Sequence, residues 1–341
     1  VQWQRRGYSG IEELSRSLAA PIAEAVERGA ALVAFPAGPG DEVARLVAAG
    51  RLGQSCGSDV PKLFARLGCD LARQYGVTLS LGPVWDWSLG APQRLAYLFG
   101  PTGEVLGSQA QTHRNLQDRA AGVVSAGCLA PIVSPAGRLG LLSGVDVAYP
   151  EVSRILCLQG AGILIYHGVR HDGTEAIALS NLWREVQANQ VFGVEALAVG
   201  PGLGGRSSII APVELTADGT GWLARAPSDD APAVVVANLD AAALERLLGR
   251  YPIFALRNVP QYRHYIPLLY EKQGTVATDV SPSAVAGELA GEVPVRSDRG
   301  LSPAGERFPL RHGAPVPSLE PASPRRTVQT VHRAADRLPR H

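Results

Sequence analysis

Residues 138–151 of this 341-residue chain read RLGLLSGVDVAYPE, and the segments on both sides continue the same alternation of strand and helix. Residues 139–142 form a short apolar run that is typical of a buried strand. Pro150 follows where a helix can begin, because the missing N–H of proline is harmless in the first helical turn. The stretch therefore predicts a strand followed by a helix over residues 150–158.

The same alternation extends outward over residues 1–271. The spacing of Ser9 and Glu12 matches a helix capping box, and the apolar stripe behind it predicts a helix that ends at Gly29. Further helices are expected over 60–75, 175–191 and 241–251, and strands over 31–35, 77–85, 94–99, 105–110, 163–166, 194–199, 208–212 and 234–238. The pair 94–99 and 105–110 is expected to form a hairpin. Two similar halves of this kind predict an α/β protein with two sheets packed face to face and helices outside.

The composition changes near residue 281. The last 61 residues contain nine prolines and nine arginines, with almost no apolar periodicity. Such a segment cannot bury enough apolar surface by itself to offset the entropy lost when a chain is ordered. We therefore divide the chain into a folded domain, residues 1–271, and an extended arm, residues 272–341. The arm is either a flexible tail or becomes ordered on another subunit.

The overall composition limits the function classes. Apolar residues make up 46% of the chain and charged residues 18%, as in a globular protein. Thirty-two basic and 31 acidic residues give a net charge of +1, so nothing favours binding to nucleic acid or to an anionic membrane. The longest apolar runs are far shorter than a transmembrane helix.

Cysteine and methionine usage adds two expectations. The four cysteines have no CxxC spacing, so we expect buried free thiols and neither a zinc site nor another cofactor: Cys56, Cys69, Cys128 and Cys157. The sequence has no methionine, even at position 1. A cleaved secretion signal would explain this, so we expect a secreted or cell-surface protein, with a cytoplasmic protein as the alternative.

Several stretches together resemble the nitrilase superfamily, the carbon–nitrogen hydrolases. Residues 29–36 (GAALVAFP) resemble the strand that leads into a Phe-Pro-Glu motif in that family. Residues 97–113 (YLFGPTGEVLGSQAQTH) are similar to the hairpin before the family's lysine, and residues 138–151 to its nucleophile elbow. The resemblance covers about residues 1–271. It implies a four-layer α-β-β-α sandwich that usually dimerises, followed here by the proline-rich arm.

The resemblance also implies which positions would carry the chemistry. Members of the family hydrolyse nitriles or amides with a glutamate, a lysine and a cysteine. In this chain Ala37 stands where the glutamate belongs, Gln111 where the lysine belongs and Gly144 where the cysteine belongs. Asp118 most nearly matches an auxiliary glutamate. Because the members of a catalytic set act as a unit, losing all three implies a pseudoenzyme.

Other residues near the elbow could replace the lost groups. Ser143 adjoins Gly144, but neighbouring side chains on a strand point to opposite faces. His113 could act as a base, although we expect it to have a structural role. Four more residues are expected to pack in the core or to hold the elbow and the helix start: Cys128, Cys157, Asp146 and Glu151.

From these observations we expect a catalytically inactive protein with a structural role. Its partner would be itself, through a dimer face and further contacts that build a higher oligomer or a filament. Two alternatives stay open. One is an amide or nitrile hydrolase that uses non-standard residues, and the other is a small-molecule binding module that uses the vacated pocket.

Overall fold

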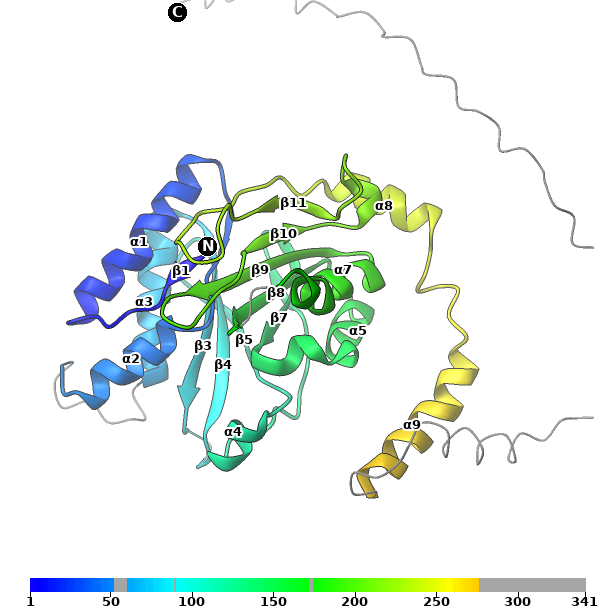
Figure 1. The fold of residues 1–341 in the computed structure, drawn as a ribbon, viewed down its shortest axis with the longest axis horizontal. Coiled ribbons are helices and arrows are strands. Elements are labelled where there is room, and N and C mark those ends of the chain that lie inside the picture. Colours follow the sequence, from blue (N-terminus) through cyan, green and yellow to red (C-terminus); the bar gives the residue numbers. More distant parts are fainter. Residues whose placement is uncertain (52–59, 89, 172–173, 276–341) are drawn as a thin grey trace, which may run out of the picture. The chain divides into compact units, whose positions relative to one another are not determined.

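The computed structural model describes residues 1–51, 60–88, 90–171 and 174–275. Two β-sheets form its centre (Figure 1). The smaller sheet has the order β2-β3-β4-β5, with β2 (Leu32–Ala34), β3 (Thr78–Asp86), β4 (Gln93–Phe99) and β5 (Val105–Ala110). The larger has the order β11-β10-β9-β8-β7-β6, with β1 (Trp3–Gln4) paired to β9 (Phe192–Val199). Its other strands are β6 (Ile132–Ser134), β7 (Gly137–Ser143), β8 (Ile163–Val169), β10 (Ser208–Ile210) and β11 (Trp222–Arg225).

The two sheets pack face to face, as the sequence predicts. Leu98 of β4, Leu141 of β7 and Ile165 of β8 belong to one buried apolar cluster. The hairpin of β4 and β5 is antiparallel, whereas β7, β8 and β9 are parallel to one another. Parallel strands covered on both faces need apolar side chains on both faces, which explains continuous runs such as residues 163–166.

Helices cover the outer face of each sheet, so the layers follow the order α-β-β-α (Figure 1). Helices α1 (Ile11–Glu27), α2 (Pro39–Ala48) and α3 (Val60–Tyr75) bury their apolar faces against the smaller sheet. Helices α5 (Pro150–Leu158) and α7 (Arg184–Asn189) cover the larger sheet. Further helical segments are α4 (Leu116–Ala120), α6 (Glu175–Ala178), α8 (Ala241–Arg250), the π-helical turn Leu179–Trp183 and the 3-10 turns Gly144–Ala148 and Val213–Leu215.

The chain divides into two compact units after Tyr262. Helix α9 (Val259–Thr275) crosses that position, so residues 272–275, which were assigned to the arm, are helical. The rest of the predicted arm lies outside the described residues. Among the described residues, no helix is both long and apolar enough to cross a lipid bilayer.

Three local predictions need correction. Helix α1 begins at Ile11, one residue later than expected, so the backbone N–H and hydroxyl of Ser9 donate to Glu13, at 2.9 and 2.7 Å, and not to Glu12. The helix expected over residues 175–191 is broken at Asn181 and ends at Asn189. Residues 234–238 form no strand, although their sequence is rich in valine. Helices α2 and α9 were not expected.

Candidate functional site

The elbow at Gly144 is built by the end of β7 and the 3-10 turn that follows it. Gly144 opens this turn with φ +57°, a left-handed conformation that glycine adopts without steric cost. The carbonyl oxygen of Gly144 accepts a hydrogen bond from the Tyr166 hydroxyl at 3.2 Å. The strand, turn and helix therefore form as the sequence predicts, with a glycine at the position where the chain turns.

Gln111 fills the space in front of this glycine. Gln111 is the residue directly after β5, and its side chain is buried. Its Nε2 group donates to the carbonyl oxygen of His113 at 2.6 Å and to Asp118 Oδ2 at 3.1 Å. A Cβ atom added at Gly144 would lie 2.7 Å from Gln111 Oε1. That oxygen is itself buried without a hydrogen-bond partner in the described part of the chain. The amide therefore occupies the volume where any side chain at position 144 would begin.

Asp118 is held in place from three sides. It lies in α4, where its carboxylate accepts from the backbone N–H of Asn115 at 3.2 Å as part of a capping box. Its other oxygen lies 3.7 Å from Arg94 Nε, and the Arg94 guanidinium stacks over the Trp85 ring at 4.2 Å. With Gln111 as a further donor, this carboxylate is compensated by a cation and by hydrogen bonds.

Ala37 is placed by the end of β2. It is buried, and its methyl group offers neither an acid nor a base. Contacts join Gln111 to Gly144 and to Asp118. The structure therefore brings together three of the four predicted positions.

Asp146 ties the elbow to the end of β5, a link that sequence analysis missed. Its carboxylate accepts from the Thr112 hydroxyl at 2.7 Å and from the backbone N–H groups of Thr112 and His113 at 3.0 and 2.7 Å. Burial raises the pKa of this carboxyl, and the hydrogen bonds from Thr112 and His113 oppose that rise. His113 Nδ1 lies 3.3 Å from the same carboxylate, and its partly exposed ring stacks on Tyr149 with centroids 3.7 Å apart.

The surroundings of Ser143 and Cys157, two other candidate nucleophiles, do not activate them. Ser143 is buried, and its hydroxyl has no hydrogen-bond partner in the described part of the chain. Cys157 lies in α5 and is buried, as expected. Burial raises the pKa of its thiol to about 12, so the reactive thiolate is strongly disfavoured. Cys128 is exposed, which corrects the expectation that the thiols are buried. Cys69 is half-buried, and Cys56 lies outside the described residues.

Within the parts of the chain that the structure describes, no three histidine, cysteine, aspartate or glutamate side chains gather as metal ligands would. The chemistry available at the elbow is thus hydrogen bonding by a neutral amide, a buried carboxylate and one partly exposed imidazole.

Two sheets packed between helical layers, with a strand–elbow–helix unit at Gly144, define the class of nitrilase-fold α-β-β-α sandwiches. The family model for carbon–nitrogen hydrolases matches residues 5–247, and the chain belongs to this family. Comparison with curated protein sequences gives no significant match.

Solved structures of low sequence identity share the fold. A carbon–nitrogen hydrolase from Helicobacter pylori G27 is 20% identical with a TM-score of 0.62, over 78% of this chain and 96% of that one. A double mutant of the amidase from Nesterenkonia sp. AN1 in complex with acrylamide is 21% identical with a TM-score of 0.61, over 77% and 94%. Another mutant of that amidase is also 21% identical with a TM-score of 0.61, over 77% of this chain and 97% of that one. In that structure acrylamide has been added to the active-site cysteine of the amidase.

Proposed function

We propose that this chain is a catalytically inactive member of the carbon–nitrogen hydrolase family with a structural role. The observation that carries the proposal is the packing of Gln111 against Gly144. Position 144 carries no nucleophilic side chain, and a neutral amide lies where the Cβ atom of such a side chain would be. The family's mechanism needs a cysteine thiolate that attacks the substrate and a lysine ammonium that stabilises the tetrahedral intermediate, and this chain has neither group at the matching positions.

Two exposed apolar helix faces support self-assembly. On α5, Ile155 and Leu158 are each more than two-fifths exposed, and Tyr149 before the helix is 39% exposed. Helix α9, taken by itself, exposes Val259, Tyr262, Ile266, Leu268 and Tyr270. Clusters of exposed large apolar residues are typical of protein–protein interfaces. We infer that one face makes a dimer and that a second contact, with residues 272–341 as an arm, extends it to a higher oligomer or filament.

The first experiment measures catalysis. The full chain is incubated with a panel of amides and nitriles, and product formation and intact mass are followed together. We expect no turnover above background and no covalent adduct at the elbow. Turnover that is lost in a His113→Asn variant would contradict inactivity and would favour the alternative of a hydrolase with non-standard residues.

The second experiment measures assembly by light scattering and electron microscopy. Ile155→Glu in α5 should weaken self-association at least tenfold, because a charge would be buried at an apolar contact. Val133→Glu is the matched control, since Val133 is 62% exposed on β6, outside both apolar faces. Deleting residues 281–341 should leave a folded dimer and shorten any polymer. A full-length chain that stays monomeric at high concentration would refute the assembly proposal.

The hydrolase alternative has one observation in its favour. His113 lies against the buried Asp146, which is the pairing that orients an imidazole as a general base. The Thr112 hydroxyl, 2.9 Å from His113 Nδ1, already donates to Asp146, so this hydroxyl is not positioned to give its proton to the imidazole. The alternative of ligand binding in the vacated pocket is disfavoured because Gln111 fills the space in front of Gly144.

A further inference from the structure

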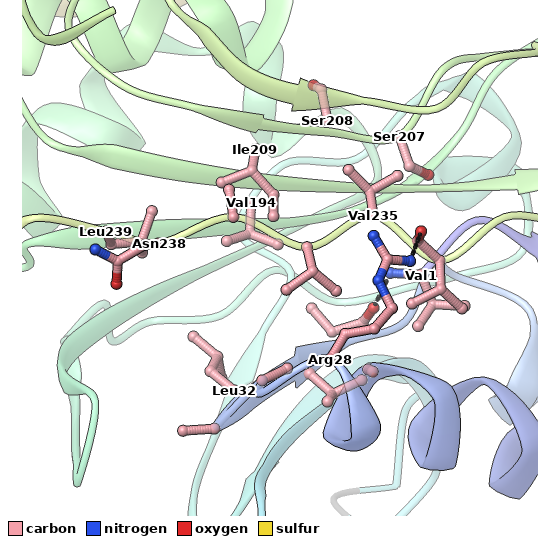
Figure 2. Close-up of a pocket in the computed structure, with 18 of the residues that line it drawn as sticks. Val1, Arg28, Leu32, Val194, Ser207, Ser208, Ile209, Val235, Asn238 and Leu239 are labelled. Atoms are coloured by element: carbon pink, nitrogen blue, oxygen red, sulfur yellow. Dashed lines mark hydrogen bonds between the residues drawn. The ribbon is translucent and has the colours of Figure 1, made fainter.

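A cavity of about 390 Å³ lies at the free edge of β2 (Figure 2). Apolar side chains such as Leu32, Val194 and Val235 line most of it, and the Arg28 guanidinium at its side already donates to the carbonyl oxygen of Val234 at 2.7 Å. None of its lining residues has a buried side-chain nitrogen or oxygen that lacks a hydrogen-bond partner within the described part of the chain. The lining of this cavity therefore does not select a polar ligand.

Unpaired polar side chains are found instead where α5 packs against α7. Four atoms of these two helices are buried without a hydrogen-bond partner among the described residues: Ser153 Oγ, Arg184 Nη2, Glu185 Oε2 and Asn189 Oδ1. Three of the four residues are at most 1% exposed, and only Arg184 reaches the surface. Because a buried polar atom without a partner costs free energy, such atoms are normally paired.

Contacts within α7 place three of these atoms close together. Glu185 and Asn189 are one helical turn apart, and Asn189 Nδ2 donates to the backbone carbonyl oxygen of Glu185 at 2.8 Å. Arg184 Nε donates to Glu185 Oε1 at 2.7 Å. An arginine that binds both oxygens of a carboxylate uses Nε and Nη2 together. Here the bond from Nε is made, and Nη2 and Glu185 Oε2 are the two halves of that pair that stay open.

Contacts between the helices bring the α5 side chain to the same seam. Arg154 Nη2 donates to the carbonyl oxygen of Ala188 at 2.8 Å, so the residue next to Ser153 is bonded to the residue before Asn189. Cys157 follows Ser153 by one turn on the buried face of α5. Burial is the main cause of the raised pKa of the Cys157 thiol, and the nearby Glu185 carboxylate adds to that rise. The Ser153 face of α5 therefore lies toward Glu185.

We propose that one water molecule binds in this seam and pairs all four atoms. A water molecule donates two hydrogen bonds and accepts two. Glu185 Oε2 and Asn189 Oδ1 can only accept, whereas Arg184 Nη2 can only donate and the Ser153 hydroxyl can donate. Water would donate to the first two and accept from the other two. The donors and acceptors of the seam are thus matched with none left over, as is typical of buried water sites.

The charges around the seam favour water over a cation. Carboxylate, amide and hydroxyl oxygens are also ligands of hard cations. Arg184 already pairs with the Glu185 carboxylate, and the Arg154 guanidinium binds the carbonyl oxygen of Ala188 beside Asn189. A cation in the seam would be repelled by both guanidinium groups and could not accept a hydrogen bond from Arg184 Nη2. A neutral molecule that both donates and accepts is therefore favoured.

The position of the site gives this water a long residence time. All four atoms are buried, so water bound to them exchanges with solvent only when α5 and α7 separate. Helix α5 also exposes Ile155 and Leu158, so the same water would help to fix the helix that carries part of the proposed association surface. The site itself does not rest on that proposal.

The experiment counts long-lived water molecules in the full chain by oxygen-17 magnetic relaxation dispersion. Asn189→Leu keeps the size of the side chain but removes its amide oxygen, and Ser153→Val replaces the hydroxyl on the other helix with methyl groups. Ser17→Val is the matched control, because Ser17 is also a helix serine but its hydroxyl already donates to the carbonyl oxygen of Leu14 at 2.7 Å. Melting temperatures are measured in sodium, potassium and choline chloride at equal ionic strength.

We expect one long-lived water molecule fewer in Asn189→Leu and in Ser153→Val than in the wild type and Ser17→Val, and the same melting temperature in all three salts. An unchanged count in either seam variant would overturn the proposal, and a count of zero in the wild type would do so without any variant. A melting temperature that is higher in sodium or potassium than in choline, with the difference lost in Asn189→Leu, would show a bound alkali cation and would also overturn it.

Discussion

His167 provides the sharpest test of how the two sheets are held together. It lies on β8, is completely buried, and its Nδ1 is 2.6 Å from the carbonyl oxygen of Phe35 at the end of β2. Because a carbonyl only accepts, Nδ1 must carry the proton, and Nε2 then accepts from the Ser80 hydroxyl of β3 at 3.1 Å. A neutral imidazole satisfies both contacts. Burial lowers the pKa of His167 to about 4 from the ordinary value of 6.5.

The lowered pKa of His167 determines how much, and in which direction, the free energy of unfolding changes with pH. The unfolded chain binds a proton at His167 below pH 6.5, whereas the folded chain does so only near pH 4. The free energy of unfolding therefore falls as the pH drops from about 6.5 to about 4. Each pKa unit corresponds to 1.36 kcal/mol, so the full loss from this residue is about 3 kcal/mol, of which about 2 kcal/mol is reached at pH 5.

The assay is urea unfolding of the wild type and of His167→Asn between pH 7 and pH 5. Asparagine can still donate to Phe35 but has no proton to gain. The wild type should lose about 2 kcal/mol relative to the variant over this range. The carboxyls of Asp146 and Glu195, whose pKa burial raises, act in the opposite direction, but they are common to both proteins and cancel in the difference.

His264→Asn serves as the control, since His264 is exposed on α9 and is not part of the buried contact between His167, Phe35 and Ser80. Stability curves that run parallel for the wild type and His167→Asn would refute the buried neutral imidazole.

Two further predictions concern the elbow and the thiols. Gly144→Ala should destabilise the protein by about 2 kcal/mol, because the methyl group forces Gln111 to give up hydrogen bonds and φ is positive. The double variant with Gln111→Ala should cost at least about 1 kcal/mol less than the sum of the single changes in a double-mutant cycle, and additive effects would disprove the contact. In the native protein a thiol reagent should label Cys128 quickly and Cys157 only on unfolding. Early labelling of Cys157 would show that α5 opens in the native state.

Local sequence patterns predicted those elements whose signals lie within one segment. The bounds of α3, β5 and α5 agree with the prediction because apolar spacing and a well-placed proline mark them directly. Helix α2 begins with Pro39 and Gly40, residues that also mark loops, and α9 contains Pro267, so neither was recognised. Residues 234–238 have the composition of a strand, but a strand also needs a partner, and no strand in the described part of the chain pairs with them.

At the candidate site, too, local sequence patterns predicted positions but not the contacts between them. The positions of Gln111, Gly144 and Asp118 followed from motif order, and the structure brings them into contact. What Gln111 does there depends on a contact across 33 residues of sequence, and the bonds from Asp146 to Thr112 cross 34. Local sequence patterns do not predict contacts between residues that are so far apart in the sequence.

The contact between Gly144 and Gln111 also imposes an order on mutational paths. Any side chain introduced first at position 144 meets Gln111 Oε1 and displaces the amide that donates to His113 and Asp118. A change at position 111 that comes first opens the space and makes the second substitution tolerable. Variants of this protein that acquire a side chain at the elbow should therefore arise from backgrounds in which residue 111 has already been replaced, and libraries that randomise position 144 alone should return mostly glycine.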